Sequence, residues 1–140
     1  MTRARAIGIH VLGLLGVLVT TFLRWARTGR QWRSSYDLFG VARRVGFTNN
    51  EMLASALRLW VLLPALIGLA LVFAAFHRPR IGTAVGVVVG AAAVSAGAAV
   101  LSSKLHTGAA PSICLAAGIL VLISGVAVFI APAWREQAEQ

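Results

Sequence analysis

The chain has 140 residues, of which 59% are hydrophobic and only 12% are charged. Its mean hydropathy is +0.83, whereas soluble domains are about half apolar and about a quarter charged. A soluble fold of this length cannot bury so many apolar side chains, because a small domain exposes a large share of its surface. The composition therefore excludes an ordinary soluble domain and predicts one integral membrane domain, residues 1–140.

The formal net charge is +9, from 13 Lys and Arg against 4 Asp and Glu. Such an excess suggests nucleic-acid binding in a soluble protein. Here the basic residues lie outside the apolar segments, where each contributes about 1 kcal/mol of attraction to anionic lipid. We therefore expect contact with anionic membrane lipid, and no nucleic-acid partner. Cys114 is the one cysteine, which excludes an internal disulfide and a multi-cysteine metal site.

Four apolar segments have lengths close to the roughly 20 residues that cross a bilayer. The first follows Arg3 and Arg5, as the apolar part of a secretory signal peptide would. Large residues at its end do not suit a signal peptidase, so we predict a retained helix, with cleavage as the alternative. The expected fold is all-α, an integral membrane four-helix bundle with both termini on one side. The predicted spans are residues 7–23, 59–76, 81–101 and 113–130.

The long first loop, residues 24–58, is the one segment outside the spans that is large enough to fold. Ser34 and Asp37 have the spacing of a capping box, which predicts a helix start. The apolar residues that follow recur at helical spacing on one face, so we predict an amphipathic helix at the membrane interface that ends near Gly46. A second capping box at residues 48–51 predicts that the second span begins outside the bilayer.

Arginines recur at every third position where this loop begins, the spacing of a voltage-sensing helix. They lie beside polar residues outside the hydrocarbon, however, so we predict contact with lipid phosphates or with a partner protein. Tryptophans at span boundaries, Trp25, Trp60 and Trp134, are expected to anchor the bundle in the head-group layer. The residues predicted to contact lipid or a partner are Arg24, Arg27, Arg30, Arg33, Arg43, Arg44, Trp25 and Trp32.

The third span has a smooth face of small residues that includes Gly82, Gly86, Gly90 and Gly97. In lipid, such a face lets another helix backbone approach closely. The partner is either a helix of the same bundle or a second protein, and the sequence leaves this open. The link at residues 77–80 is too short for anything but an antiparallel hairpin of spans two and three. We expect spans three and four to pair likewise, with Pro111 opening the fourth helix.

The orientation follows from the distribution of Lys and Arg, which is ambiguous. The termini and the second link hold five, and the other side holds eight, seven of them in the first loop. A plain count places that loop in the cytoplasm. Charges directly beside short spans weigh more, so we favour cytoplasmic termini. The five are Arg3, Arg5, Arg78, Arg80 and Arg135.

Catalytic machinery is not recognisable in this sequence. Asp37 and Glu51 are the acidic residues outside the C-terminal tail, and both already have capping roles, so we expect no enzyme and no metal site. His10 and His77 form the one pair that lies on a suitable side for a bis-histidine haem, which leaves a redox-enzyme anchor as a remote alternative and no cofactor as our prediction. Pro64 is expected to kink the second span without a mechanistic role.

The stretch from Arg33 to Leu38, after a first span that ends in Arg24 and Trp25, resembles small bacterial four-span membrane proteins without an assigned activity. The resemblance implies only the layout. Our leading hypothesis is a non-catalytic accessory or scaffold subunit of a complex in the bacterial inner membrane, bound to other membrane subunits or to itself. The alternative is a small oligomeric transporter or channel.

Overall fold

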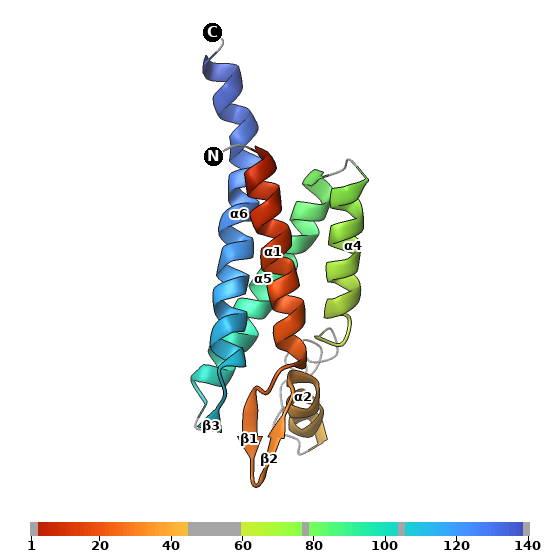
Figure 1. The fold of residues 1–140 in the computed structure, drawn as a ribbon, viewed down its shortest axis with the longest axis vertical. Coiled ribbons are helices and arrows are strands. Elements are labelled where there is room, and N and C mark those ends of the chain that lie inside the picture. Colours follow the sequence, from red (N-terminus) through yellow and green to blue (C-terminus); the bar gives the residue numbers. More distant parts are fainter. Residues whose placement is uncertain (1–2, 45–59, 77–78, 104–105, 139–140) are drawn as a thin grey trace.

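The computed structural model describes residues 3–44, 60–76, 79–103 and 106–138 (Figure 1). Within these ranges the chain is mostly helical. Helix α5 contacts α1, α4 and α6, and successive long helices run in opposite directions along the molecule. The elements are the helices α1 (Arg3–Phe22), α2 (Ser35–Arg44), α4 (Leu63–Ala75), α5 (Pro79–Leu101) and α6 (Ala110–Ala138), and the strands β1 (Ala26–Thr28), β2 (Gln31–Arg33) and β3 (His106–Thr107).

Three helices are long and apolar enough to cross a membrane, at Arg5–Phe22, Arg80–Leu101 and Ala110–Ile130. They match the first, third and fourth predicted spans, and their length and composition are those of a membrane protein. Their outward faces carry large apolar side chains, and exposing these side chains to lipid costs no free energy. Examples that are more than half exposed are Leu12, Val19, Val88, Ile123 and Val126.

The second predicted span, residues 59–76, is only partly a continuous helix. Helix α4 has 13 residues, about 20 Å at about 1.5 Å per residue, which is shorter than the hydrocarbon layer. Residues 61–62 form a turn directly before α4, and Pro64 lies in the first turn of α4, where its missing N–H breaks no helical hydrogen bond. The predicted kink of the second span is therefore an interruption before α4 and not a bend within it. The second capping box, at residues 48–51, and Gly46 lie outside the described residues.

The predicted neighbours along the chain are confirmed. Helix α4 packs against α5, and α5 packs against α6, in both cases as antiparallel pairs. The first residues of α1 and the last residues of α6 lie at the same end of the molecule (Figure 1). Pro111 is the second residue of α6, as expected for a proline that opens a helix.

A three-stranded antiparallel sheet of order β2-β1-β3 lies at the opposite end. The prediction of an all-α chain omits this sheet. Strands β1 and β2 are joined by the two-residue turn Gly29 and Arg30, in which Gly29 has a φ of 63° that a glycine adopts without strain. Strand β3 comes from the link between α5 and α6, and its residues His106 and Thr107 pair with Arg27 and Ala26.

The helix predicted after residue 34 is present as α2, and the Ser34 half of its capping box is formed, while the Asp37 carboxylate accepts from the Ser34 hydroxyl. The backbone N–H of Asp37 donates to Ser34 Oγ at 3.3 Å, and Ser34 Oγ donates to Asp37 Oδ2 at 3.0 Å. Leu38 is buried and Phe39 is half-buried, whereas Gly40 on the other side of the helix is exposed. The apolar side of α2 therefore faces the protein in this part of the helix.

Candidate functional site

The sheet and α2 form a folded unit on the end of the bundle, which we call the cap (residues 24–44 and 106–107). Two hydrogen bonds fasten it to the last turn of α1, and a third joins it to Trp60, shortly before α4. Trp25 Nε1 donates to the Thr20 carbonyl at 2.6 Å, and Ser35 Oγ donates to the Thr21 carbonyl at 2.7 Å. Trp60 Nε1 in turn donates to Ser35 Oγ at 3.2 Å. The cap thereby satisfies carbonyls that the end of a helix leaves free.

An aromatic cluster lies under the cap. The ring centroids of Trp25, Phe39 and Trp60 are 5.1–6.0 Å apart, and every pair meets edge to face. Trp25 has no exposed surface, and Trp60 is 6% exposed. The predicted lipid contact of Trp25 is therefore wrong, and neither indole anchors the bundle in the head-group layer. Burial wins because the indole N–H of each tryptophan finds a partner inside the fold. The side chain of Trp134 lies outside the described residues.

The predicted lipid-contacting arginines do not form a single helical stripe. Arg24 precedes β1, Arg27 lies in β1, Arg30 in the turn and Arg33 in β2. The first three side chains are exposed, and Arg33 is half-buried. Their spacing of three places them around a hairpin, because residues alternate between the two faces of a strand. The side chains of the other two predicted arginines, Arg43 and Arg44, lie outside the described residues.

One face of the sheet presents a polar and aromatic row. Arg27 lies directly between Trp32 on β2 and His106 on β3, because both are its register partners. All three side chains are exposed, and Arg27 Nε donates to the Gly29 carbonyl at 3.2 Å. A cation between two aromatic rings on an exposed face is suited to contact an anionic group.

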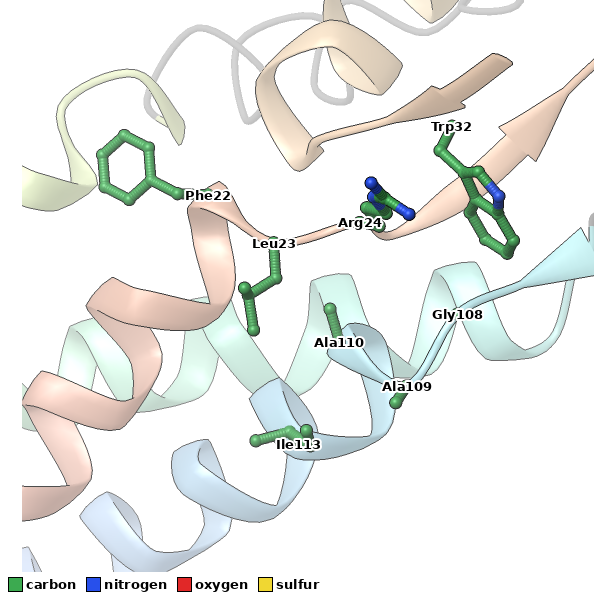
Figure 2. Close-up of a pocket in the computed structure, with 8 residues that line it drawn as sticks. All are labelled: Phe22, Leu23, Arg24, Trp32, Gly108, Ala109, Ala110 and Ile113. Atoms are coloured by element: carbon green, nitrogen blue, oxygen red, sulfur yellow. The ribbon is translucent and has the colours of Figure 1, made fainter. Parts of the chain in front are cut away.

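An open pocket of about 520 Å³ lies where the cap meets the ends of α1 and α6 (Figure 2). Figure 2 shows Leu23 pointing toward Ala110 and Ile113, and the indole of Trp32 pointing toward Gly108. One side of the pocket is apolar and belongs to the helix ends, while the other carries the Arg24 guanidinium and the Trp32 indole. The lining residues are Phe22, Leu23, Arg24, Trp32, Gly108, Ala109, Ala110 and Ile113.

Gly108 allows this pocket to form. Its backbone N–H donates to the Trp25 carbonyl at 2.9 Å. A Cβ at this position would lie 2.6 Å from the Arg24 carbonyl oxygen and 3.4 Å from the Trp32 ring. A residue without a side chain therefore lets the α5–α6 link lie against the Arg24 carbonyl at the edge of the pocket.

A second cluster of polar residues lies inside the bundle, around His10 of α1. His10 is 4% exposed, and its Nδ1 lies 3.1 Å from both the Val121 carbonyl oxygen and Ser124 Oγ of α6. Because a carbonyl can only accept, Nδ1 is the donor in this contact, and in a neutral ring Nε2 is then the nitrogen without a proton. Among the described residues, Nε2 is buried without a hydrogen-bond partner. It faces the Gly86 backbone of α5, where an added Cβ would overlap it.

Each of the predicted glycines lies against a helix of the same chain. Gly82 is so close to α4 that an added Cβ would lie 2.6 Å from the Ala70 carbonyl oxygen. Gly86 faces His10 of α1, and Gly90 and Gly97 face α6, with an added Cβ 3.1 Å from the Gly118 carbonyl and 2.9 Å from the Pro111 carbonyl, respectively. The small-residue face of α5 is thus occupied within the bundle, and no free surface is left at these positions.

Sequence reasoning missed the groups on the other side of these contacts. Gly13 and Gly118 allow α1 and α5, respectively, to approach α6, and Ser124 holds the His10 ring. Gly118 and Gly125 are seven residues apart, a spacing that places them on the same side of α6 and could have indicated a packing face. The role of Ser35 under the cap had no such signal, because its two partners lie elsewhere in the chain.

The remaining predicted residues are placed as follows. The Nε2 atom of His10 faces backbone, which leaves no space for a haem iron at that nitrogen in this arrangement, and His77 lies outside the described residues. Ser95 is exposed on the outer side of α5 and donates to the Ala91 carbonyl of its own helix at 2.8 Å. It therefore does not face the interior of the bundle.

Comparison with protein-family models, with curated proteins and with solved structures finds no match to this chain. The resemblance to small bacterial four-span proteins that residues 33–38 suggest therefore stays a prediction.

Proposed function

We propose that the protein is a non-catalytic accessory or scaffold subunit of a bacterial inner-membrane complex, and that its basic cap contacts anionic lipid or a partner protein. The observation that carries the proposal is the division of the described surface into two parts. The long helices expose apolar side chains around the bundle, and the cap exposes Arg24, Arg27 and Arg30. A rigid cationic end on an apolar body is suited to binding at a membrane surface rather than to turnover.

The interior of the bundle supports a structural role. Its close contacts are made by glycines and by a histidine that is seated against the backbone. In the described parts of the four apolar segments no Asp, Glu, Lys or Arg interrupts the apolar sequence between the boundaries. Proton-coupled carriers commonly place such a group within the membrane.

A mild-detergent affinity purification of the tagged full chain tests the proposal, with mass spectrometry of the eluate and a native mass measurement. A stoichiometric membrane protein partner is the expected result. The double variant Arg27→Gln and Arg30→Gln should reduce recovery of that partner, whereas Arg80→Gln, which removes an exposed charge at the other end of the bundle, should not. A homo-oligomer without a partner would contradict the proposal.

The proposal includes a fourth crossing, in which α4 and the residues before it complete the span, and cytoplasmic termini. The cap then lies outside the cytoplasm. Arg30→Cys tests this in intact cells, because the native Cys114 is buried and should not react. Labelling by a membrane-impermeant maleimide is expected. Labelling only after the membrane is opened would reverse the orientation.

A small oligomeric transporter is the second candidate, and one observation favours it. His10, Thr83 and Ser124 come from three helices and are all buried inside an apolar bundle, where polar groups often mark a path for a solute. Flux in vesicles that is lost in His10→Ala and kept in Ser95→Ala, whose side chain is exposed, would favour transport. Vesicles that show no flux would favour the subunit.

A further inference from the structure

The pocket beside the cap joins an apolar half to a cationic half. Leu23 and Ile113 are 43% and 49% exposed, although they lie at the ends of membrane-spanning helices and face the pocket. Arg24, the residue after Leu23, contributes a guanidinium that has no hydrogen bond or ion pair with the described residues. An unpaired cation directly beside exposed apolar side chains marks a site for an amphipathic anion.

We propose that this pocket binds one anionic phospholipid, with its phosphate at the Arg24 guanidinium and its acyl chains along Leu23 and Ile113. The proposal deepens the proposed function, on which it rests, by naming the lipid class and the place where the cap holds it. The pocket volume of about 520 Å³ lies within the range of ligand sites, about 300–1,000 Å³. It accommodates a head group and the first part of the chains, while the rest extends along the apolar bundle.

Charge complementarity selects the occupant. The chain has a formal net charge of +9, and Arg24 forms a charge-assisted hydrogen bond with a phosphate oxygen. A zwitterionic lipid carries a second charge that is positive, which the basic cap repels. The Trp32 indole closes the head-group side, a position that suits its apolar body and polar N–H. Figure 2 places Arg24 between Leu23 and Trp32, at the boundary between the two halves.

Arg30, another arginine of the cap, serves as the control for the charge of Arg24. Arg30 carries the same charge, but it lies in the turn of the hairpin and does not line the pocket. If the whole cap attracted lipid only through its field, loss of either charge would have the same effect. If the pocket binds the lipid, loss of the Arg24 charge should reduce lipid retention more than loss of the Arg30 charge.

The experiment is native mass spectrometry of the purified full chain in detergent with equimolar phosphatidylglycerol and phosphatidylcholine. The wild type should retain one phosphatidylglycerol in preference to phosphatidylcholine. Arg24→Gln should lower the retained fraction about fivefold, the fold-change that corresponds to about 1 kcal/mol for one arginine. Arg30→Gln should lower it by less than about twofold, and Trp32→Ala should lower it without any change in charge.

Equal losses in Arg24→Gln and Arg30→Gln would overturn the pocket, as would equal retention of the two lipids by the wild type. Glycerol phosphate added in excess separates the two sources of a phosphate group: continued retention of the lipid supports a site that needs the acyl chains, and its displacement overturns that site. The affinity purification reports separately on the proposed function. If a partner is recovered but the protein shows no preference for phosphatidylglycerol, only the lipid site is contradicted. If the lipid is retained but no partner is recovered, only the subunit role is contradicted.

Discussion

The cap and the interior of the bundle are held together in opposite ways. Under the cap, large aromatic rings are buried, and their indole N–H groups are bonded to Thr20 and Ser35. Between the long helices, glycines allow backbones to approach, and Gly86 receives the ring of His10. The difference follows from the surroundings. Water drives the burial of aromatic surface at the cap, whereas in lipid the association of helices depends on close packing of small residues.

Replacement of Trp25 should lower the stability of the protein more than any other proposed substitution. The side chain is fully buried, contacts Phe39 and Trp60, and donates a hydrogen bond to α1. We expect Trp25→Ala to lower the free energy of unfolding by about 3–5 kcal/mol. The measurement is the midpoint of thermal unfolding in a mild detergent.

Trp32→Ala is the matched control, because Trp32 lies on the same hairpin and is 44% exposed. It should cost less than about 1 kcal/mol. Equal losses for the two tryptophans would show that the cap does not depend on the buried cluster.

A methyl group at Gly86 should have the next largest effect. The added Cβ overlaps His10 Nε2, so the ring or the helix must move. We expect Gly86→Ala to cost about 1–3 kcal/mol, as overpacking does, measured by the same thermal unfolding. Gly68→Ala is the control, since nothing lies within 4 Å of a Cβ at that position, and it should be neutral or slightly stabilising.

The double variant His10→Ala and Gly86→Ala sharpens this test. Removal of the ring frees the space that the methyl group needs, so the two changes should be less destabilising together than their sum. If the two losses of unfolding free energy simply added, Gly86 and His10 would not be in contact. If Gly86→Ala instead left unfolding unchanged and altered the native mass, the glycine face would pack against a second protein.

The same substitution at two serines compares the two regions most directly. Ser35 Oγ bonds the Thr21 carbonyl and accepts from Trp60, so Ser35→Ala leaves two buried groups without their partner. We expect a loss of about 1–3 kcal/mol. Ser124 bonds His10 and the Val121 carbonyl within the span, where polar contacts average about 0.6 kcal/mol. Thermal unfolding midpoints should therefore fall more for Ser35→Ala, and the reverse order would refute the comparison.

The parts of the fold that depend on local pattern could be predicted from the sequence. The three long helices follow from the length of their apolar segments, and the start of α2 follows from the spacing of Ser34 and Asp37. The antiparallel pairs follow from short links. Each of these features needs only neighbouring residues, because helix length, capping and loop reach are set within a few turns of the chain.

The sheet, the burial of Trp25 and the position of the His10 ring depend on contacts between segments that are distant in the sequence. Strands of two or three residues have no periodicity to recognise, and β1 pairs with β3, which comes from the distant link between α5 and α6. The glycine face of α5 can be recognised in the sequence, but the helices that pack against it cannot. A side chain at a span boundary can face lipid or the protein, and the choice depends on which distant groups accept its hydrogen bond.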